Sequence, residues 1–481
     1  MVERIRHWVV AMFENRSFDS LLGHLPHIGA ADGIRDREIA LPYPGGSVRV
    51  RPTQKFTDPD PDPGEAWPNV NVQMYGHHRP ESNAGKAAYS IMPNFMSEPY
   101  NQPDQPAVPT MDGFATDYFA NFVWWVGRKP TDTEMQAIGG VFTPQTAPVL
   151  NTLASEFAVF TRWFCEAPTC TFPNRSFYHT GTSLGRIDNE AIVNFAWQND
   201  TPNLFDLLTD KGIAWKAYFD RATQIVPDCA INLSGLHHVR MWHQHVADWS
   251  DFYADAAAGA LPAYSWIEPN LLFGPLCDYH PPTDIRAGER WLASVYDAVV
   301  RSPQWESTAL VVLFDEHGGC YDHVPPPSAP VPDDSPGQLG FAFDRFGVRI
   351  PAIVISPYTE KGTVVTDTFH TTSVLRTLRE HFDLGPALTR RDAAAPGLAP
   401  AFNRREPRTD RPAVTPPTYV PPARDARPGM SQLGEAAMRN AARLAGVHPD
   451  DAPTSPGEGQ SFLKKTLFDN GRLRIPSFRS S

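Results

Sequence analysis

The stretch HWVVAMF at His7–Phe13 and the stretch ALVVLF at Ala309–Phe314 are nearly continuous apolar runs. A strand with one buried face alternates apolar and polar side chains, whereas a strand that is covered on both faces is apolar throughout. The two stretches therefore predict strands of a sheet that has helices on both sides.

Shorter apolar stretches alternate with amphipathic segments along the rest of the chain. Predicted strands lie at Ile213–Phe219, Tyr264–Ile267 and Ile350–Ile355, and predicted helices at Asn151–Phe157, Pro202–Thr209, Asp284–Val300 and Thr371–Phe382. This alternation is typical of an α/β fold with a mostly parallel sheet sandwiched by helices. In such sheets, ligands bind beyond the carboxyl ends of the strands.

Length and composition exclude several classes of protein. The chain has 481 residues, of which 41% are hydrophobic, so it can form a sizeable core. Its 42 basic and 54 acidic side chains give a net charge of −12, which argues against nucleic-acid binding. Five cysteines without a CxxC pair indicate neither a disulfide framework nor a zinc site.

The sequence gives no sign of membrane insertion or export. No apolar run approaches the roughly 18 residues of a transmembrane segment. The apolar run within Met1–Phe13 ends at Glu14 without a small-residue cleavage site, so it does not resemble a signal peptide. We therefore expect a cytoplasmic protein without a transmembrane segment, and transient contact with a membrane surface stays open.

Prolines suggest the domain organisation. The 49 prolines concentrate at residues 42–110 and again at residues 406–428. We interpret 42–110 as a long, lid-like insertion in a catalytic domain that spans residues 1–405. Residues 406–430 are interpreted as an extended proline-rich strap, and 431–481 as a short extension with a helix at Ser431–Ala445.

Acidic side chains follow several of the predicted strands directly. Glu14 and Asn15 come after the first strand, Asp315 and Glu316 come after ALVVLF, and Glu268 comes after Tyr264–Ile267. Taken alone, each of these acids is better explained as a cap of the following helix. Because strand ends meet at one edge of the sheet, however, the two adjacent pairs predict a site of hard oxygen ligands for Mg²⁺, Ca²⁺ or Mn²⁺.

Two further motifs allow both a structural and a functional interpretation. The glycines of Asp315-Glu316-His317-Gly318-Gly319 suit a tight turn with positive φ, or the close approach of a ligand. In the string TFPNR, Thr171 is a candidate catalytic hydroxyl, and Arg175 is able to bind an oxyanion through two hydrogen bonds.

Four histidines are candidates for the same site. His280 and His370 each precede a predicted helix, and for both a capping or core role competes with catalysis. His323 follows the acids of the second strand closely and is a candidate neighbour of a metal site. His78 lies in the lid-like insertion, where lining a pocket and lying on the surface are equally good interpretations.

Six strings in order resemble one known family. They are FENRSFDSLLG, PTCTFPNRSFYHTGTS, DYHPPTDIRAGE, SPQWESTALVVLFDEHGGCYDHVPPP, FGVRIPAIVISPY and FHTTSVLRTLREHF. Together they look like the phosphoesterase family of bacterial phospholipases C and acid phosphatase, within the alkaline-phosphatase superfamily. The resemblance extends over about residues 5–402, and it implies an alkaline-phosphatase-like fold.

The resemblance also implies roles for individual residues. It assigns Glu14, Asn15, Asp315 and Glu316 to one hard divalent cation, and makes Thr171 the nucleophile and a further metal ligand. His280 and His370 resemble the histidines around the transferred phosphoryl group, and Asp278 resembles a neighbouring acid. His78 is a candidate for the family's remaining active-site histidine. Sulfatases of the superfamily need a cysteine or serine where this chain has Thr171, so phosphoryl chemistry is favoured.

Three functions are compatible with this resemblance. The first is a metal-dependent phosphodiesterase of the phospholipase C kind, which forms a phosphothreonine on Thr171 and acts on a small-molecule or lipid phosphoester. The second is an acid phosphatase on the same scaffold. The third is an inactive member of the family that binds a ligand.

Overall fold

The computed structural model describes residues 2–76, 108–189, 199–222, 242–271, 275–420 and 451–463, together with a few isolated positions. An eight-stranded sheet lies at the centre of this part of the chain, in the order β13-β6-β12-β11-β1-β10-β8-β9. From one edge to the other, its strands are β13 (Thr363–Val365), β6 (Ala158–Phe160), β12 (Ala352–Ile355), β11 (Thr308–Phe314), β1 (His7–Phe13), β10 (Tyr264–Ile267), β8 (Trp215–Phe219) and β9 (Val246–Asp248).

The two apolar runs are neighbouring strands in the interior of the sheet. β1 pairs in parallel with β10 on one side and with β11 on the other. All of β11 is buried, and in β1 only His7 is partly accessible. Within this sheet β12 alone runs in the opposite direction, because it pairs antiparallel with both β11 and β6. The predicted α/β fold with a mostly parallel sheet is therefore confirmed.

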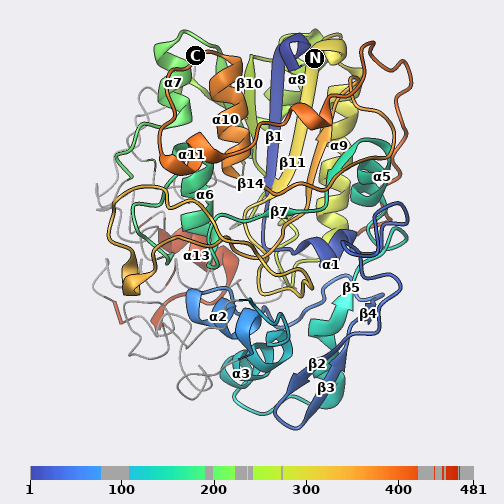
Figure 1. Ribbon diagram of the computed structural model, residues 1–481, viewed down its shortest axis with the longest axis vertical. Coiled ribbons are helices and arrows are strands. Elements are labelled where there is room, and N and C mark those ends of the chain that lie inside the picture. The colour runs from blue at the N-terminus through green and yellow to red at the C-terminus, as the bar shows by residue number, and fades with distance from the viewer. Residues whose placement is uncertain are drawn as a thin grey trace.

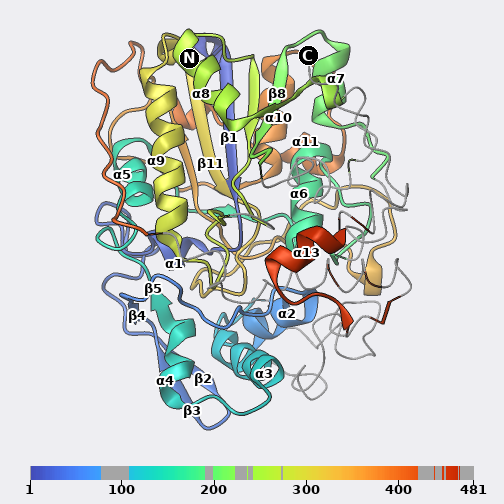
Figure 2. The ribbon, with the colours of Figure 1, turned by 180° about the vertical axis from the view of Figure 1, so that it is seen from behind.

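Helices cover the sheet on both sides. Figures 1 and 2 show α6, α10 and α11 together on one side, and α5, α8 and α9 on the other. Their bounds are α5 (Pro148–Glu156), α6 (Thr171–Thr180), α7 (Leu204–Asp210), α8 (Trp249–Ala258), α9 (Ile285–Arg301), α10 (Thr372–His381) and α11 (Arg390–Ala394). No helix in the described ranges is both long enough and apolar enough to cross a membrane.

Proline explains two shifts between the predicted and the observed elements. The helix expected from Asn151 begins already at Pro148, because the first turn of a helix tolerates a residue without an N–H group. The strand expected from Ile350 begins at Ala352, because Pro351 cannot donate a hydrogen bond to a neighbouring strand.

A second group of elements lies below the carboxyl ends of β1 and β11 (Figure 1). It has its own hydrophobic cluster, which includes Val48, Met74, Tyr118 and Ile138 and also contacts Tyr321 of the main domain. Its elements are β2 (Ala40–Tyr43), β3 (Gly46–Arg49), β4 (Arg51–Pro52), α2 (Trp67–Tyr75), α3 (Phe114–Val126), α4 (Asp132–Met135) and β5 (Gly140–Val141). Much of the described part of the lid-like insertion is thus packed against this cluster. The short helix α1 (Phe18–Leu22) precedes this group and packs in the main core.

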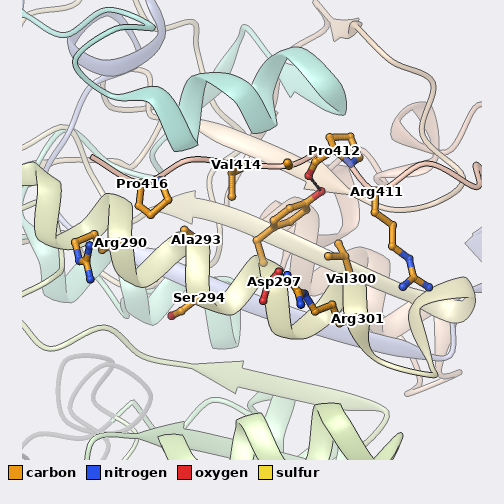
Figure 3. Close-up of a pocket in the computed structure, with 12 residues that line it drawn as sticks. Arg290, Ala293, Ser294, Asp297, Val300, Arg301, Arg411, Pro412, Val414 and Pro416 are labelled. Carbon is orange, nitrogen blue, oxygen red and sulfur yellow. Dashed lines mark hydrogen bonds and ion pairs between the residues drawn. The ribbon is translucent and has the colours of Figure 1, made fainter. Parts of the chain in front are cut away.

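The proline-rich strap follows the outer face of α9. Residues 406–420 contain no helix or strand, and the Tyr296 hydroxyl donates a hydrogen bond of 2.8 Å to the carbonyl of Pro412. Arg290, Arg411 and Val414 line a groove of about 700 Å³ between the strap and the helix (Figure 3). The expected helix at 431–445 lies almost entirely outside the described residues, so it and the domain boundaries stay predictions.

We expect the stability of the domain to depend on the packing of β11. Leu310→Ala removes a fully buried side chain, and the free energy of unfolding should fall by about 2–5 kcal/mol. The exposed Val331 is a matched control, and Val331→Ala should change the free energy of unfolding by less than about 0.5 kcal/mol. Denaturant titrations of both variants test this, and equal effects would contradict the assignment of β11 to the core.

Candidate active site

Three segments that are distant in the sequence meet where β1 and β11 end. Thr171 is the first residue of α6, and its hydroxyl donates a hydrogen bond of 3.3 Å to Glu14 Oε2. Arg175, one turn later in the same helix, donates through Nε to Glu14 Oε1 at 3.0 Å and to Asp315 Oδ2 at 3.1 Å. All four side chains are fully buried. The expected convergence of the strand ends thus brings the threonine and both acids together.

The backbone around Asn15 and Gly318 shows why this meeting point is so compact. Asn15 has a φ of 56°, and its N–H donates to Asp315 Oδ1 at 3.2 Å. Gly318 has a φ of 59°, and a Cβ atom there would lie 2.4 Å from the backbone oxygen of Asn15. A side chain at position 318 would collide with Asn15, and Gly319 also has a positive φ, of 65°, so the tight-turn interpretation of the two glycines is confirmed.

His280 joins the group from the loop before α9. Its Nδ1 lies 3.4 Å from Glu14 Oε2, and its Nε2 lies 3.1 Å from Asp62 Oδ2. Burial alone would lower the pKa of His280, but Asp62, Glu14 and Glu65 outweigh it and raise this pKa well above the usual value. These acids favour the protonated form of the imidazole, which can donate a proton.

Glu14 is the one acid of the group that stays strongly ionised. Burial by itself would raise the pKa of Glu14, but the Arg175 guanidinium and His280 lower it to about 2. A carboxylate of such low pKa is a weak base, so towards Thr171 it acts mainly as a hydrogen-bond acceptor that orients the hydroxyl.

Several other acids at this place have raised pKa values. Burial raises the pKa of Asp278 and of Glu65 to about 8 each, and burial together with Glu14 raises the pKa of Asp315 to about 7. Burial, Glu65 and Asp315 raise the pKa of Glu316 well above the usual range. We refer to Glu14, Asp62, Glu65, Asp278, Asp315 and Glu316 as the acidic cluster.

The acidic cluster and Asn15 fit a hard divalent cation. Three buried oxygen atoms, Asn15 Oδ1, Asp278 Oδ2 and Glu316 Oε1, accept no hydrogen bond from any residue that the structure describes. Buried acceptors without a donor are costly, and carboxylate and amide oxygens are the ligands that Mg²⁺, Ca²⁺ and Mn²⁺ prefer. A cation would relieve both this cost and the repulsion between the carboxylates.

His323 belongs to a different group of side chains, with Asp19 and Asp322. Ligand atoms of these three residues lie within 4.8 Å of one another, as in a metal site. However, Arg349 donates to Asp19 Oδ1 at 2.9 Å and to Asp322 Oδ1 at 2.8 Å, and His323 Nδ1 lies 2.6 Å from Asp19 Oδ2. The buried guanidinium already neutralises the two acids, so this group is a structural ion-pair network.

His370 also lies in a network of its own. Its Nδ1 is 2.8 Å from Glu166 Oε1, and Arg391 donates to Glu166 Oε2 at 2.8 Å. The backbone N–H of Thr372 donates to the same carboxylate at 2.5 Å. None of the contacts described for His370 joins it to the acidic cluster, so its role beside a phosphoryl group stays a prediction.

Glu268 and His78 are the remaining candidates. Glu268 lies at the end of β10, where its carboxylate accepts a hydrogen bond of 3.0 Å from the indole of Trp266. His78 lies outside the described residues, and its role stays a prediction.

Our sequence analysis did not identify Asp62 and Glu65, which the structure places in the acidic cluster. Both lie in DPDPDPGE at residues 58–65, which we had included in the lid-like insertion. The available signal was a run of four acids among prolines, in a segment too stiff to form a solvated helix face. Composition alone gave no reason to bring this run to the ends of β1 and β11.

Comparisons with known proteins agree with the resemblance in the sequence. A model of the Phosphoesterase family matches residues 5–385. Non-specific phospholipase C3 of Arabidopsis thaliana is 33% identical over 457 residues, which cover 90% of this chain and 79% of that protein. Phospholipase C A of Mycobacterium tuberculosis is 31% identical over 317 residues, which cover 58% of this chain and 59% of that protein.

Similarity to solved structures is weaker. A protein in the alkaline phosphatase superfamily from Vibrio parahaemolyticus has 13% sequence identity and a TM-score of 0.34, and the match covers 54% of this chain and 65% of that chain. The match to the family model, in contrast, includes Glu14, Thr171, His280 and Asp315.

The raised and lowered pKa values predict how stability depends on pH in the metal-free protein. Because Asp278 and Glu65 have pKa values of about 8, the folded state retains protons that the unfolded state loses above roughly pH 4. Stability should therefore fall as the pH rises from 5 to 8. The low pKa of Glu14, about 2, has the opposite effect on stability. The stability that ionised Glu14 contributes to the folded state is lost as the pH falls below roughly 4.

Thermal unfolding in the presence of chelator at pH 5 and pH 8 measures this effect. The midpoint should be lower at pH 8, and Asp278→Asn should make the difference smaller, since it removes one titrating group. A midpoint that rises towards pH 8 in the wild-type protein would contradict the assigned shifts.

Proposed function

The chain belongs to the Phosphoesterase family and is a phosphoric ester hydrolase, and we propose that it is a divalent-cation-dependent phosphodiesterase of the phospholipase C kind. The observation that carries this proposal is the contact of the Thr171 hydroxyl with Glu14 at the N-terminus of α6, beside the acidic cluster. The names of the relatives support a lipid phosphodiester as substrate.

Thr171 is positioned as a nucleophile. Its hydroxyl hydrogen is directed at Glu14 Oε2, so that an oxygen lone pair is free to attack a phosphorus atom. The N-terminus of a ten-residue helix carries a partial positive charge, which favours a phosphoryl group next to Thr171. As the Thr171 oxygen attacks in line with the leaving group and forms a phosphothreonine, its proton passes along the hydrogen bond to Glu14 Oε2. When water hydrolyses the phosphothreonine, Glu14 returns this proton to Thr171, and the water proton restores the protonated His280.

Arg175 connects the two strand ends that form the site. Its guanidinium bonds both Glu14 and Asp315, which fixes the distance between the ends of β1 and β11. Glu14, Asn15, Asp315 and Glu316 are the residues that would hold the cation. The cation, when bound, supplies positive charge that stabilises negative oxygens and lowers the pKa of a nearby hydroxyl.

His280 is the best placed proton donor for the leaving group. Asp62 and Glu14 hold its ring on two sides, and its raised pKa keeps it protonated at neutral pH. Transfer of this proton to the departing alkoxide would release diacylglycerol from a phospholipid, or a simple alcohol from a smaller ester.

Removing the nucleophile should abolish activity without unfolding the protein. For Thr171→Ala we expect the rate of nitrophenylphosphorylcholine hydrolysis to fall by at least about 10³-fold, because no other group can form the covalent intermediate. Thr377, a buried threonine of α10, is a matched control, and Thr377→Ala should retain most of the activity. Activity of Thr171→Ala near the wild-type level would refute the assignment.

A substrate panel tests the cation and the type of ester together. We expect nitrophenylphosphorylcholine, a diester, to be hydrolysed faster than nitrophenyl phosphate, a monoester. Exhaustive chelation should remove both activities, and Mg²⁺, Ca²⁺ or Mn²⁺ should restore them. A clear preference for the monoester would favour the acid phosphatase, whereas full activity after chelation would exclude the cation from the mechanism.

A further inference from the structure

We propose that Glu65 is a positioning residue, which turns the side-chain amide of Asn15 so that its oxygen and not its nitrogen faces the cation. This inference rests on the proposed function, because it concerns the cation site of that reaction. Glu65 lies in the proline-rich segment that follows β4, outside the strand ends that carry Glu14 and Asp315.

The two ends of the Asn15 amide have different surroundings. Nδ2 donates a short hydrogen bond to the carboxylate of Glu65 and lies 3.2 Å from His280 Nε2. Oδ1, at the other end, is buried and accepts no hydrogen bond from the described residues. The oxygen is therefore the end of the amide that is left for a ligand.

Glu65 is the neighbour that can fix this orientation. A protonated imidazole donates from both nitrogens, so His280 by itself would select the oxygen end of the amide. A carboxylate oxygen only accepts, and a bound cation favours the ionised form of Glu65, so Glu65 selects the NH₂ end. Without Glu65, the amide could rotate its oxygen towards His280 and present its NH₂ group to the cation, which a cation cannot use as a ligand.

Asn189 connects Glu65 to helix α6. Asn189 donates to Glu65 Oε1 at 3.4 Å, and the amide oxygen of Asn189 accepts from the backbone N–H of Phe172 at 2.8 Å. The position of Glu65 is thus coupled to the first turn of α6, which carries Thr171.

The neighbouring backbone also keeps Glu65 in place. Gln73 of α2 donates to the carbonyl of Gly64 at 2.7 Å, and a Cβ atom at Gly319 would lie 2.5 Å from that same carbonyl oxygen. Glycine at position 319 therefore allows the segment before Glu65 to pack directly on the turn that follows Asp315 and Glu316.

Calorimetric titration of the full chain with Mn²⁺ tests the proposal without relying on turnover. Glu65→Ala should weaken Mn²⁺ binding by about 10–100-fold, the usual effect of losing a partner that orients a ligand. Glu65→Gln should weaken it less than about fivefold, because the glutamine oxygen still accepts from Asn15. The exposed Glu38 is a matched control, and Glu38→Ala should not change the affinity.

A double-mutant cycle with Asn15→Asp separates positioning from direct ligation. Aspartate has oxygen at both ends, so in this background Glu65→Ala should cause less than about a threefold further loss of affinity. An equal loss in both backgrounds, or a loss in Glu65→Gln as large as in Glu65→Ala, would show that Glu65 binds the cation directly and would overturn the proposal.

The same titrations distinguish this inference from the proposed function. If the wild-type protein binds no Mn²⁺, Mg²⁺ or Ca²⁺, both are wrong. If the wild-type protein binds the cation and Glu65→Ala binds it equally well, only the role of Glu65 is wrong. Circular dichroism of each variant shows whether it is folded, and Glu65→Gln, which keeps the size of the side chain, covers the case in which Glu65→Ala is not.

Discussion

The site depends on one buried guanidinium. Arg175 donates hydrogen bonds to Glu14 at the end of β1 and to Asp315 at the end of β11, and all three side chains are fully buried. Two carboxylates this deep in the protein would repel each other strongly without a cation between them. Because Arg175 is one turn from Thr171 in α6, the same ion pairs also place the hydroxyl against Glu14.

The site contains more carboxyl groups than cationic side chains. Arg175 and the protonated His280 provide two positive charges, whereas the acidic cluster contains six carboxyl groups, of which Asp278 and Glu65 have pKa values of about 8. A protein rarely buries so many acids together unless a ligand of opposite charge binds among them. A hard cation would supply that charge, and would account for a site that costs folding stability at neutral pH.

The resemblance and the strand pattern predicted part of this site. Other residues that were predicted from the same pattern have different partners in the structure. Glu14 and Asp315 were identified because they follow buried strands directly, and the carboxyl ends of parallel strands meet. His323 and Glu268 also follow buried strands closely. However, His323 contacts Asp19, which is paired with Arg349, and Glu268 accepts a hydrogen bond from Trp266. The position of a residue directly after a strand determines only that the residue lies at the end of that strand. Which side chain it contacts depends on the loop that packs against the strand end.

The sequence by itself determined the α/β fold and the family, because apolar runs and motif order are local properties of the chain. Only the tertiary structure decided that Asp62 and Glu65 join the active site, because their position depends on how α2 packs beside the turn at Gly318 and Gly319. Such packing joins residues that are some 250 positions apart, and the free energy that favours it comes from the whole interface rather than from any one motif.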